Sequence, residues 1–294
     1  MSRSVAFQHQ RNWDLRAAGN FIGGGSGAGL IVTAALAAAA GAPFRVALAI
    51  GLGCVLAGLS LVWLEIGRPW RALNVFFHPR ASWMTREAIV ALLLIPTGAV
   101  AVVEGGTATA AVAASLACGF LYCQAQMLRA ARGIPAWCQD AIVPFILAAG
   151  LAEGSGLYLI AGTPDARWLA LALFAGLVRE VAWRAYRAGL ARMPAAARSV
   201  ALFDAPSAML MQRAQPAGLA LIALALVFVV VAPSAVVPGA VEVLAFAGGA
   251  VAALAGWGMK ALLITRAAYT RSVAIPFLPT RGSRGAHARQ ISSS

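Results

Sequence analysis

The stretch R-E-A-I-V-A-L-L-L-I-P-T-G-A-V-A-V-V-E at 86–104 decides the fold, since its only charged residues stand at its two ends. A helix of about 20 apolar residues crosses the roughly 30 Å hydrocarbon core of a bilayer. Further apolar stretches of this kind lie on both sides of it, at 17–40, 44–64, 107–130, 139–161, 166–184, 216–237 and 239–263. The pattern predicts an all-α polytopic membrane protein with about eight transmembrane helices in two four-helix bundles. We expect residues 1–264 to form this domain and 265–294 a basic tail.

Composition supports this fold class. The 294 residues are 61% hydrophobic and only 11% charged, whereas a soluble domain has roughly 45–50% apolar and about 25% charged residues. The net charge of +13 could indicate a nucleic-acid binder. We reject that class, because the basic residues stand in short segments between apolar runs.

Arginine placement tests the predicted spans. When ends and loops are assigned alternately to two sides, 21 of the 23 Lys and Arg residues fall on one side, leaving only Arg45 and Arg167 on the other. The positive-inside rule puts the rich side, with both termini, in the cytoplasm, as in a bacterial inner-membrane protein. The weakest predicted span is 166–184, since Arg179 and Glu180 fall near its end.

Histidine and cysteine usage argues against bound metal. The histidines, His9, His78 and His287, all lie outside the predicted spans, so we expect neither haem nor a histidine-ligated metal in the bundle. No cysteine pair has C-x-x-C spacing, which argues against an iron–sulfur cluster in this chain. The first 19 residues are polar and predict no cleavable signal peptide.

Two further segments have two interpretations each. The run G-G-G-S-G-A-G at 23–29, within the first predicted span, favours close helix packing, with room for a flat ligand as the alternative. In loop 69–80, aromatic and polar residues alternate at helical spacing. This predicts an interfacial amphipathic helix, serving either as an anchor or as a lid or docking surface.

Four ionisable residues are predicted at one membrane depth: Glu65, Arg68, Arg86 and Glu87. Such groups often mark a site, because they cost free energy at the hydrocarbon edge unless paired or hydrated; snorkelling ion pairs are the alternative. Polar residues of the first and fourth spans approach the same level, among them Asn20, Tyr122 and Gln126.

This set of residues suits a quinone. A quinone needs an apolar slot for its tail and donors such as Tyr, Arg, Asn or Gln for its carbonyls. Its reduction takes two electrons and two protons, which carboxyl groups can relay. Glu65 and Glu87 are the candidates, with the neighbouring arginines keeping them ionised or oriented.

Three other charged residues lie within or near spans. Glu153 either faces a polar channel or is neutralised by local bonds. We expect Glu180 to pair with Arg179, Arg184 or a neighbouring helix. Lys260, near the end of the last span, is expected to snorkel.

The motifs L-E-I-G-R-P-W-R-A at 64–72 and S-W-M-T-R-E at 82–87 resemble those of the membrane anchors of DMSO-reductase-type molybdoenzymes, including polysulfide-reductase and NrfD-like anchors. R-G-I-P-A-W at 132–137 and the closing segment from Arg266 fit the same pattern. The resemblance implies an eight-helix subunit without haem or iron–sulfur cluster of its own that exchanges electrons with ubiquinone or menaquinone.

The resemblance also implies partners and site residues. It implies a docked four-cluster iron–sulfur subunit and a molybdopterin catalytic subunit. Glu87 matches the glutamate implicated in quinol binding, and the expected docking residues are Arg71, Trp83, Arg129 and Arg132. DMSO-reductase anchors have histidine where Glu65 stands, so Glu65 would be a substitute proton relay.

The arginine count places the motif loop, and hence the partners, in the cytoplasm. Relatives with that arrangement include phenylacetyl-CoA:acceptor oxidoreductase and membrane-bound sulfite dehydrogenase, and W-D-L-R-A-A-G-N-F-I-G-G-G at 13–25 is most similar to the first. The expected function is therefore a quinone-reactive anchor. The alternatives are a transporter, which needs a midplane site, and a passive anchor without a quinone site.

Overall fold

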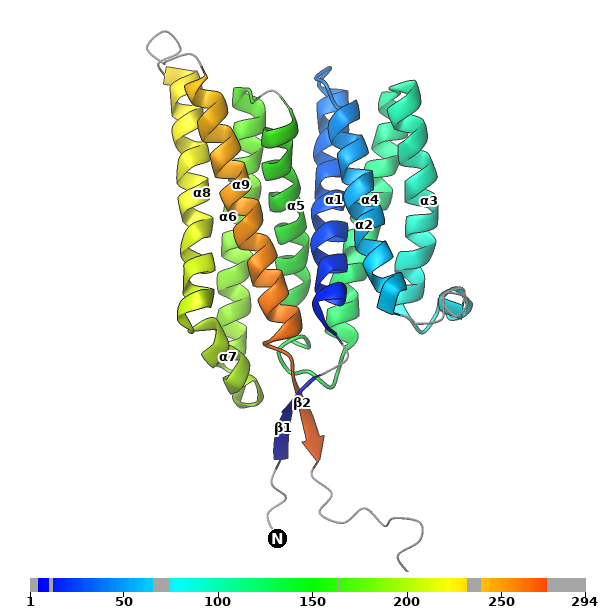
Figure 1. Ribbon diagram of the computed structural model, residues 1–294, viewed down its shortest axis with the longest axis vertical. Helices are drawn as coiled ribbons and strands as arrows, with labels where there is room; N and C mark the ends of the chain where they lie inside the picture. Colours follow the sequence, from blue (N-terminus) through cyan, green and yellow to red (C-terminus); the bar gives the residue numbers. More distant parts are fainter. Residues whose placement is uncertain (1–4, 11–12, 66–73, 163, 232–238, 274–294) are drawn as a thin grey trace, which may run out of the picture.

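The structure is a computed structural model that describes residues 5–10, 13–65, 74–162, 164–231 and 239–273. Its long helices run roughly parallel to one another (Figure 1). They are α1 (Leu15–Ala39), α2 (Arg45–Glu65), α3 (Trp83–Glu104), α4 (Thr107–Ala130), α5 (Ile142–Ala161), α6 (Ala166–Ala191), α8 (Pro206–Val231) and α9 (Ala240–Thr265).

The described helices confirm an all-α polytopic membrane protein. Seven of them are long and apolar enough to cross a membrane. The other long helix, α6, has 26 residues and packs against α5 and α8, but it carries several charged side chains. Large apolar side chains stay exposed on the helix surfaces, including Leu92, Phe174 and Leu254. Lipid is the solvent that accommodates an exposed apolar belt of this size.

The helices form two groups of four. In the first group α1 packs against α2 and α4, and α3 packs against α4; in the second α5 packs against α6 and α9, and α8 against α9. The groups meet mainly where α1 lies against α5. Because successive long helices are antiparallel, one end of the molecule carries the start of α1 and the end of α9 (Figure 1). We call it the ribbon end, because the two ends of the chain pair there in a short antiparallel ribbon.

Glycines allow α1 to lie at the centre of the bundle. A Cβ on Gly27 would come within 2.9 Å of Cys54 and Val55 in α2, and a Cβ on Gly29 or Gly154 would collide with the backbone of the facing helix, α5 or α1. Small residues let membrane helices approach closely and gain van der Waals contact. The packing interpretation of run 23–29 is therefore confirmed for Gly27, which faces α2, and for Gly29, which faces α5.

A short antiparallel ribbon, absent from the sequence-based expectations, joins the two ends of the chain. β1 (Val5–His9) pairs with β2 (Tyr269–Val273), below the helices in Figure 1. Gln10 extends the closure by donating to the carbonyls of Trp13 and Ile264 at 2.7 and 3.2 Å. Five-residue strands more than 250 positions apart give too weak a periodic signal to be read as partners.

Several expected boundaries differ from the structure. Helix α8 begins at Pro206, ten residues before the predicted 216, and a short helix α7 (Ala197–Phe203) precedes it, after the 3-10 turn Pro194–Ala196. Within the predicted amphipathic helix 69–80, residues 74–77 form a single 3-10 turn, and 66–73 lie outside the described residues. The tail 274–294 lies outside them too.

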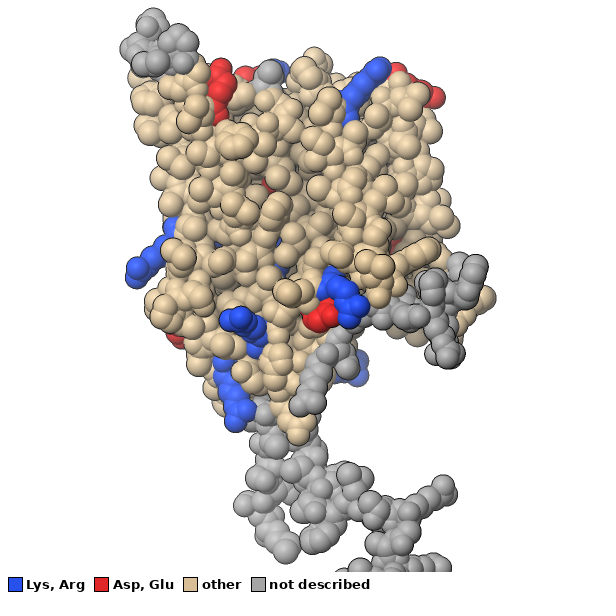
Figure 2. Space-filling model, in the orientation of Figure 1, with Lys and Arg blue, Asp and Glu red and all other residues tan. Residues whose placement is uncertain are grey.

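Charge is distributed unevenly along the molecule. Figure 2 shows a broad band almost free of charged side chains, with basic side chains mainly below it, toward the ribbon end. Arg45 is the first residue of α2 and Arg167 the second residue of α6, at the opposite end. The alternation of basic and non-basic ends that the sequence predicts is thus present in the described helices.

Candidate functional site

The candidate site lies at the ribbon end, where α3 begins beside α1 and α4. Ser82 caps α3 by accepting a hydrogen bond from the Thr85 amide at 3.3 Å, and the Thr85 hydroxyl donates to the carbonyl of Val75. The cap fixes the first turn of the helix, because it satisfies an amide that has no partner within the helix. Glu87 follows four residues into α3, about 6 Å along the axis at 1.5 Å per residue.

Glu87 points into the bundle, and only 3% of its surface is exposed. The side-chain amide of Asn20 in α1 donates to Oε1 of Glu87 at 3.4 Å. Gln124 of α4 is a further polar neighbour of Glu87, and it donates to the carbonyl of Asn20 at 3.0 Å. Three helices therefore supply one buried carboxyl group and two amides.

Arg86 does not pair with Glu87, which corrects the expectation that the arginine holds this carboxylate. Its guanidinium donates to the carbonyls of Pro79 and Arg80 at 2.8 and 2.9 Å. It also stacks over the Trp83 ring, 4.1 Å from the ring centroid. Adjacent helical residues point about 100° apart, so Arg86 faces the loop while Glu87 faces the interior. Among the described residues, no cation is paired with Glu87.

A second group of polar side chains lies at the surface of the same helix ends. Tyr122 in α4 is 43% exposed and meets Trp83 edge-on, with ring centroids 5.7 Å apart. Gln126 donates to the Tyr122 hydroxyl at 2.7 Å and is largely buried. Met84, beside Trp83 in α3, is exposed as well. They offer an amphipathic surface beside a buried carboxyl group.

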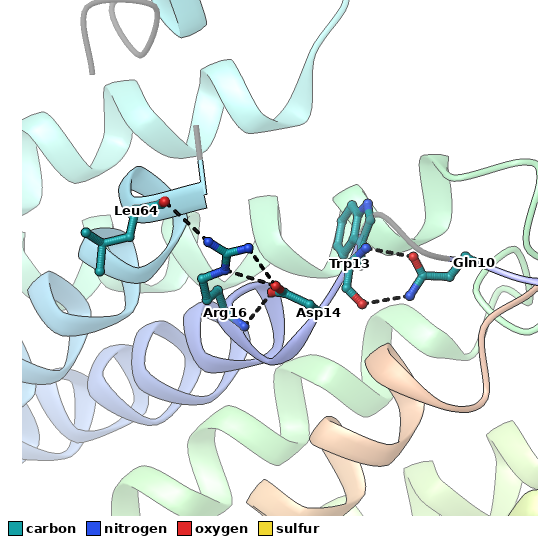
Figure 3. Close-up of polar contacts among 5 residues, drawn as sticks. All are labelled: Gln10, Trp13, Asp14, Arg16 and Leu64. Atoms are coloured by element: carbon teal, nitrogen blue, oxygen red, sulfur yellow. Dashed lines mark hydrogen bonds and ion pairs between the residues drawn. The ribbon is translucent and has the colours of Figure 1, made fainter. Parts of the chain in front are cut away.

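The start of α1 is tied to the end of α2, as Figure 3 shows. Asp14 accepts hydrogen bonds from the amide and the guanidinium of Arg16, which also donates to the carbonyl of Leu64 at 3.3 Å. The hydrogen bond from the Arg16 side chain lowers the pKa of Asp14 below its ordinary value of 3.8. This contact fixes α1, and with it Asn20, relative to the end of α2.

Several predicted site residues cannot be placed. The side chain of Glu65 and the residues Arg68 and Arg71 lie outside the described residues. Of the other expected docking residues, Arg129 pairs with the exposed Asp140 at 2.7 Å, and Arg132 is exposed. The structure therefore brings Asn20 to Glu87 and Tyr122 to Gln126 and Trp83.

The structure also contains a buried ion pair that the sequence reading missed. Lys260 of α9 is fully buried and donates to Oε2 of Glu153 in α5 at 2.7 Å. Ser26 of α1 donates to the same oxygen at 2.5 Å, and Trp257 donates to Ser26 at 2.8 Å. The expected snorkelling of Lys260 is wrong, and Glu153 is held by a cation rather than by local bonds alone. A long side chain snorkels only if it faces the surface, and this face of α9 meets α5 and α1.

The expectation for Glu180 is confirmed. It pairs with Arg184 at 3.1 Å and with Arg179 at 3.9 Å. Arg179 itself is only 2% exposed, lies beside the Phe145 ring and interacts electrostatically with Glu153. For the Glu153–Lys260 pair, the signal in the sequence was the presence of opposite charges in two different predicted spans.

No family model matches this sequence, and no curated protein shows significant similarity to it.

Proposed function

We propose that this chain is the quinone-reactive membrane anchor subunit of a molybdopterin oxidoreductase complex. The observation that carries the proposal is Glu87: a buried carboxyl group with no cation partner among the described residues, one helical turn from the half-buried Trp83, whose ring meets the exposed Tyr122. Intramembrane carboxyl groups without a structural counter-ion are functional candidates, because burying them has a free-energy cost that packing alone does not offset.

The residues present fit the needs of a quinone head group. Asn20 and Gln124 can donate to a carbonyl, and Glu87 can carry a proton. Trp83, Met84 and Tyr122 offer an apolar and aromatic surface at the lipid boundary. Two electrons and two protons convert a quinone to a quinol, and Glu87 can transfer protons one at a time.

The proposal includes an arrangement in the membrane. The ribbon end faces the cytoplasm of a bacterial inner membrane, as the distribution of arginine indicates. A four-cluster iron–sulfur subunit docks there and passes electrons from a molybdopterin subunit of the phenylacetyl-CoA or sulfite dehydrogenase type. The exposed basic residues at this end, including Arg132, attract an acidic partner.

Two alternatives remain distinct from this proposal. A transporter places its substrate at the midplane, between helices interrupted there. The midplane of this bundle holds the Glu153–Lys260 pair, but α5 and α9 are continuous helices at that level. A passive anchor would bind no quinone at all.

Binding of a quinone analogue to the full chain in lipid nanodiscs tests the proposal. The fluorescence of 2-heptyl-4-hydroxyquinoline N-oxide, quenched on binding, gives the affinity without any partner subunit. We expect Glu87→Gln to weaken binding at least tenfold. Thr33→Val is the control, since this buried hydroxyl bonds only within α1, to Gly29 at 3.0 Å, and it should leave binding unchanged.

Equal binding by wild type and Glu87→Gln would contradict the proposal, and absence of binding would favour a passive anchor. In the assembled complex, Glu87→Gln should abolish quinone-coupled turnover while activity with an artificial electron acceptor is retained. Transport of a labelled solute by the chain, unaffected by quinone, would favour the transporter.

A further inference from the structure

Three buried oxygen atoms on the side chains around α1 lack a hydrogen-bond partner within the described part of the chain. They are Oδ1 of Asn20, Oε1 of Gln124 and Oε1 of Glu153. All three atoms are hydrogen-bond acceptors, so none of them can donate a hydrogen bond to another. Buried polar atoms are rarely left unsatisfied, and water bonded to two to four such groups is the usual solution.

The three residues form a series between the ribbon end and the midplane. Glu87 and Asn20 lie about 6–8 Å along α3 and α1 from their starts, while Ser26 and Glu153 lie about 16 Å along α1 and α5. Gln124 lies between these levels, since its amide nitrogen donates to the carbonyl of Asn20 and would lie 2.5 Å from a Cβ on Gly24, one turn further along α1. The ammonium group of Lys260 lies there too, donating to Phe21 in α1 at 3.2 Å as well as to Glu153.

Glycines let these polar groups lie directly against the helix backbones of α1 and α9. A Cβ on Gly25 would lie 2.7 Å from Nζ of Lys260 and 3.5 Å from Oε1 of Gln124, so the two atoms flank one point. A Cβ on Gly24 would lie 2.5 Å from the Gln124 amide nitrogen, and one on Gly256 would lie 2.5 Å from Oε1 of Glu153. These glycines face polar atoms, unlike Gly27 and Gly29, which face helix backbones.

The Glu153 carboxylate has one oxygen, Oε2, bonded by Lys260 and Ser26 and one, Oε1, without a hydrogen-bond partner among the described residues. Two cations lie around this carboxylate, Lys260 of α9 and Arg179 of α6. The unpartnered Oε1 is the atom at which a proton can be taken up.

We propose that Glu153 and Lys260 form a proton-binding site inside the bundle, connected to Glu87 by water held between Asn20, Gln124 and Lys260. In one transfer, the carboxylic acid of Glu87 gives a proton to the first water. Protons move along the hydrogen-bonded chain, and the carboxylate of Glu153 accepts one at Oε1. Glu87 ends as a carboxylate and Glu153 as a carboxylic acid, so no electron and no net proton is gained or lost.

This inference does not depend on a quinone, because its test is read on the carboxyl groups themselves. The full chain in lipid nanodiscs is subjected to a rapid pH drop from a photolysed caged proton. Infrared difference spectra then follow the carboxylic C=O stretching bands. We expect one band that is lost in Glu153→Gln and another that is lost in Glu87→Gln.

Rates decide whether the two sites are connected. In Glu87→Gln and in Gly25→Ala, the Glu153 band should form at least tenfold more slowly, whereas Thr33→Val should match the wild type. Thermal unfolding checks that each variant is folded. If Glu153→Gln alone is not folded, the double variant Glu153→Gln/Lys260→Met is used to assign the Glu153 band. The proposal is overturned if Glu153 gives no band while the protein is folded, or if its rate is unchanged in both variants. Absence of quinone-analogue binding to the wild type, with these infrared results as expected, would contradict only the function proposed above.

Discussion

Separating the Glu153–Lys260 pair should destabilise the protein strongly, whereas removing both charges should not. Both side chains are 1% exposed, and their charged atoms are 2.7 Å apart. Lys260→Met leaves a buried carboxylate whose one remaining hydrogen-bond donor among the described residues is the Ser26 hydroxyl, and Glu153→Gln leaves a buried ammonium without its counter-ion. Breaking a buried pair from one side costs about 3–5 kcal/mol, while replacing both partners with neutral groups is often close to neutral.

A double-mutant cycle measures this coupling. Wild type, the two single variants and Glu153→Gln/Lys260→Met are unfolded reversibly in mixed micelles by increasing the SDS fraction, with circular dichroism as the readout. We expect the double variant within about 1–2 kcal/mol of the wild type and an interaction energy of at least about 3 kcal/mol. The reasoning is refuted if the single effects simply add, or if Lys260→Met alone unfolds like the wild type.

Three further outcomes are expected. Gly154→Ala should destabilise by about 1–3 kcal/mol, because its Cβ collides with α1, while Gly53→Ala in α2, with no atom within 4 Å of its Cβ, should change the melting temperature little. Asp165→Ala should cost about 1 kcal/mol through loss of the α6 cap, whereas Asp165→Asn should retain the cap. The Arg167 side chain lowers the pKa of Asp165 below 3.8. The part of the cap's stability that depends on an ionised Asp165 is therefore fully present above pH 3.8 and is lost as the pH falls through the lowered pKa. Thermal unfolding measured as a function of pH checks this. Tyr122→Phe removes the acceptor of the Gln126 amide and should weaken quinone-analogue binding less than Glu87→Gln does.

The sequence predicted the long helices well because the bilayer imposes their length. The expected span 107–130 coincides with α4, and 44–64 differs from α2 by one residue at each end. Prediction was poorer where charge or tertiary contact decides the structure. Helix α8 begins in a polar segment at Pro206, where hydropathy gives no membrane signal.

The site was predicted only in part, for a geometric reason. Sequence spacing placed Glu87 and Asn20 at one depth but did not give their direction around the helix axis, so it did not show that Arg86 turns to the loop and does not hold the Glu87 carboxylate. Lys260 and Glu153 are separated by 107 positions, and only the packing of α9 on α5 shows that their side chains meet. The ribbon between the chain ends is likewise a long-range contact.

Photolabelling with an azido-quinone tests the central claim most directly, because it reports where the ring binds. The full chain in nanodiscs is illuminated with the probe, digested and mapped by mass spectrometry, with excess unlabelled quinone as competitor. The account predicts competable labelling of the ribbon-end turns of α3 and α4, around Trp83 to Glu87 and Tyr122 to Gln126, that falls sharply in Glu87→Gln. Competable labelling confined to α6, α8 or α9, or equal labelling in the variant, would contradict it.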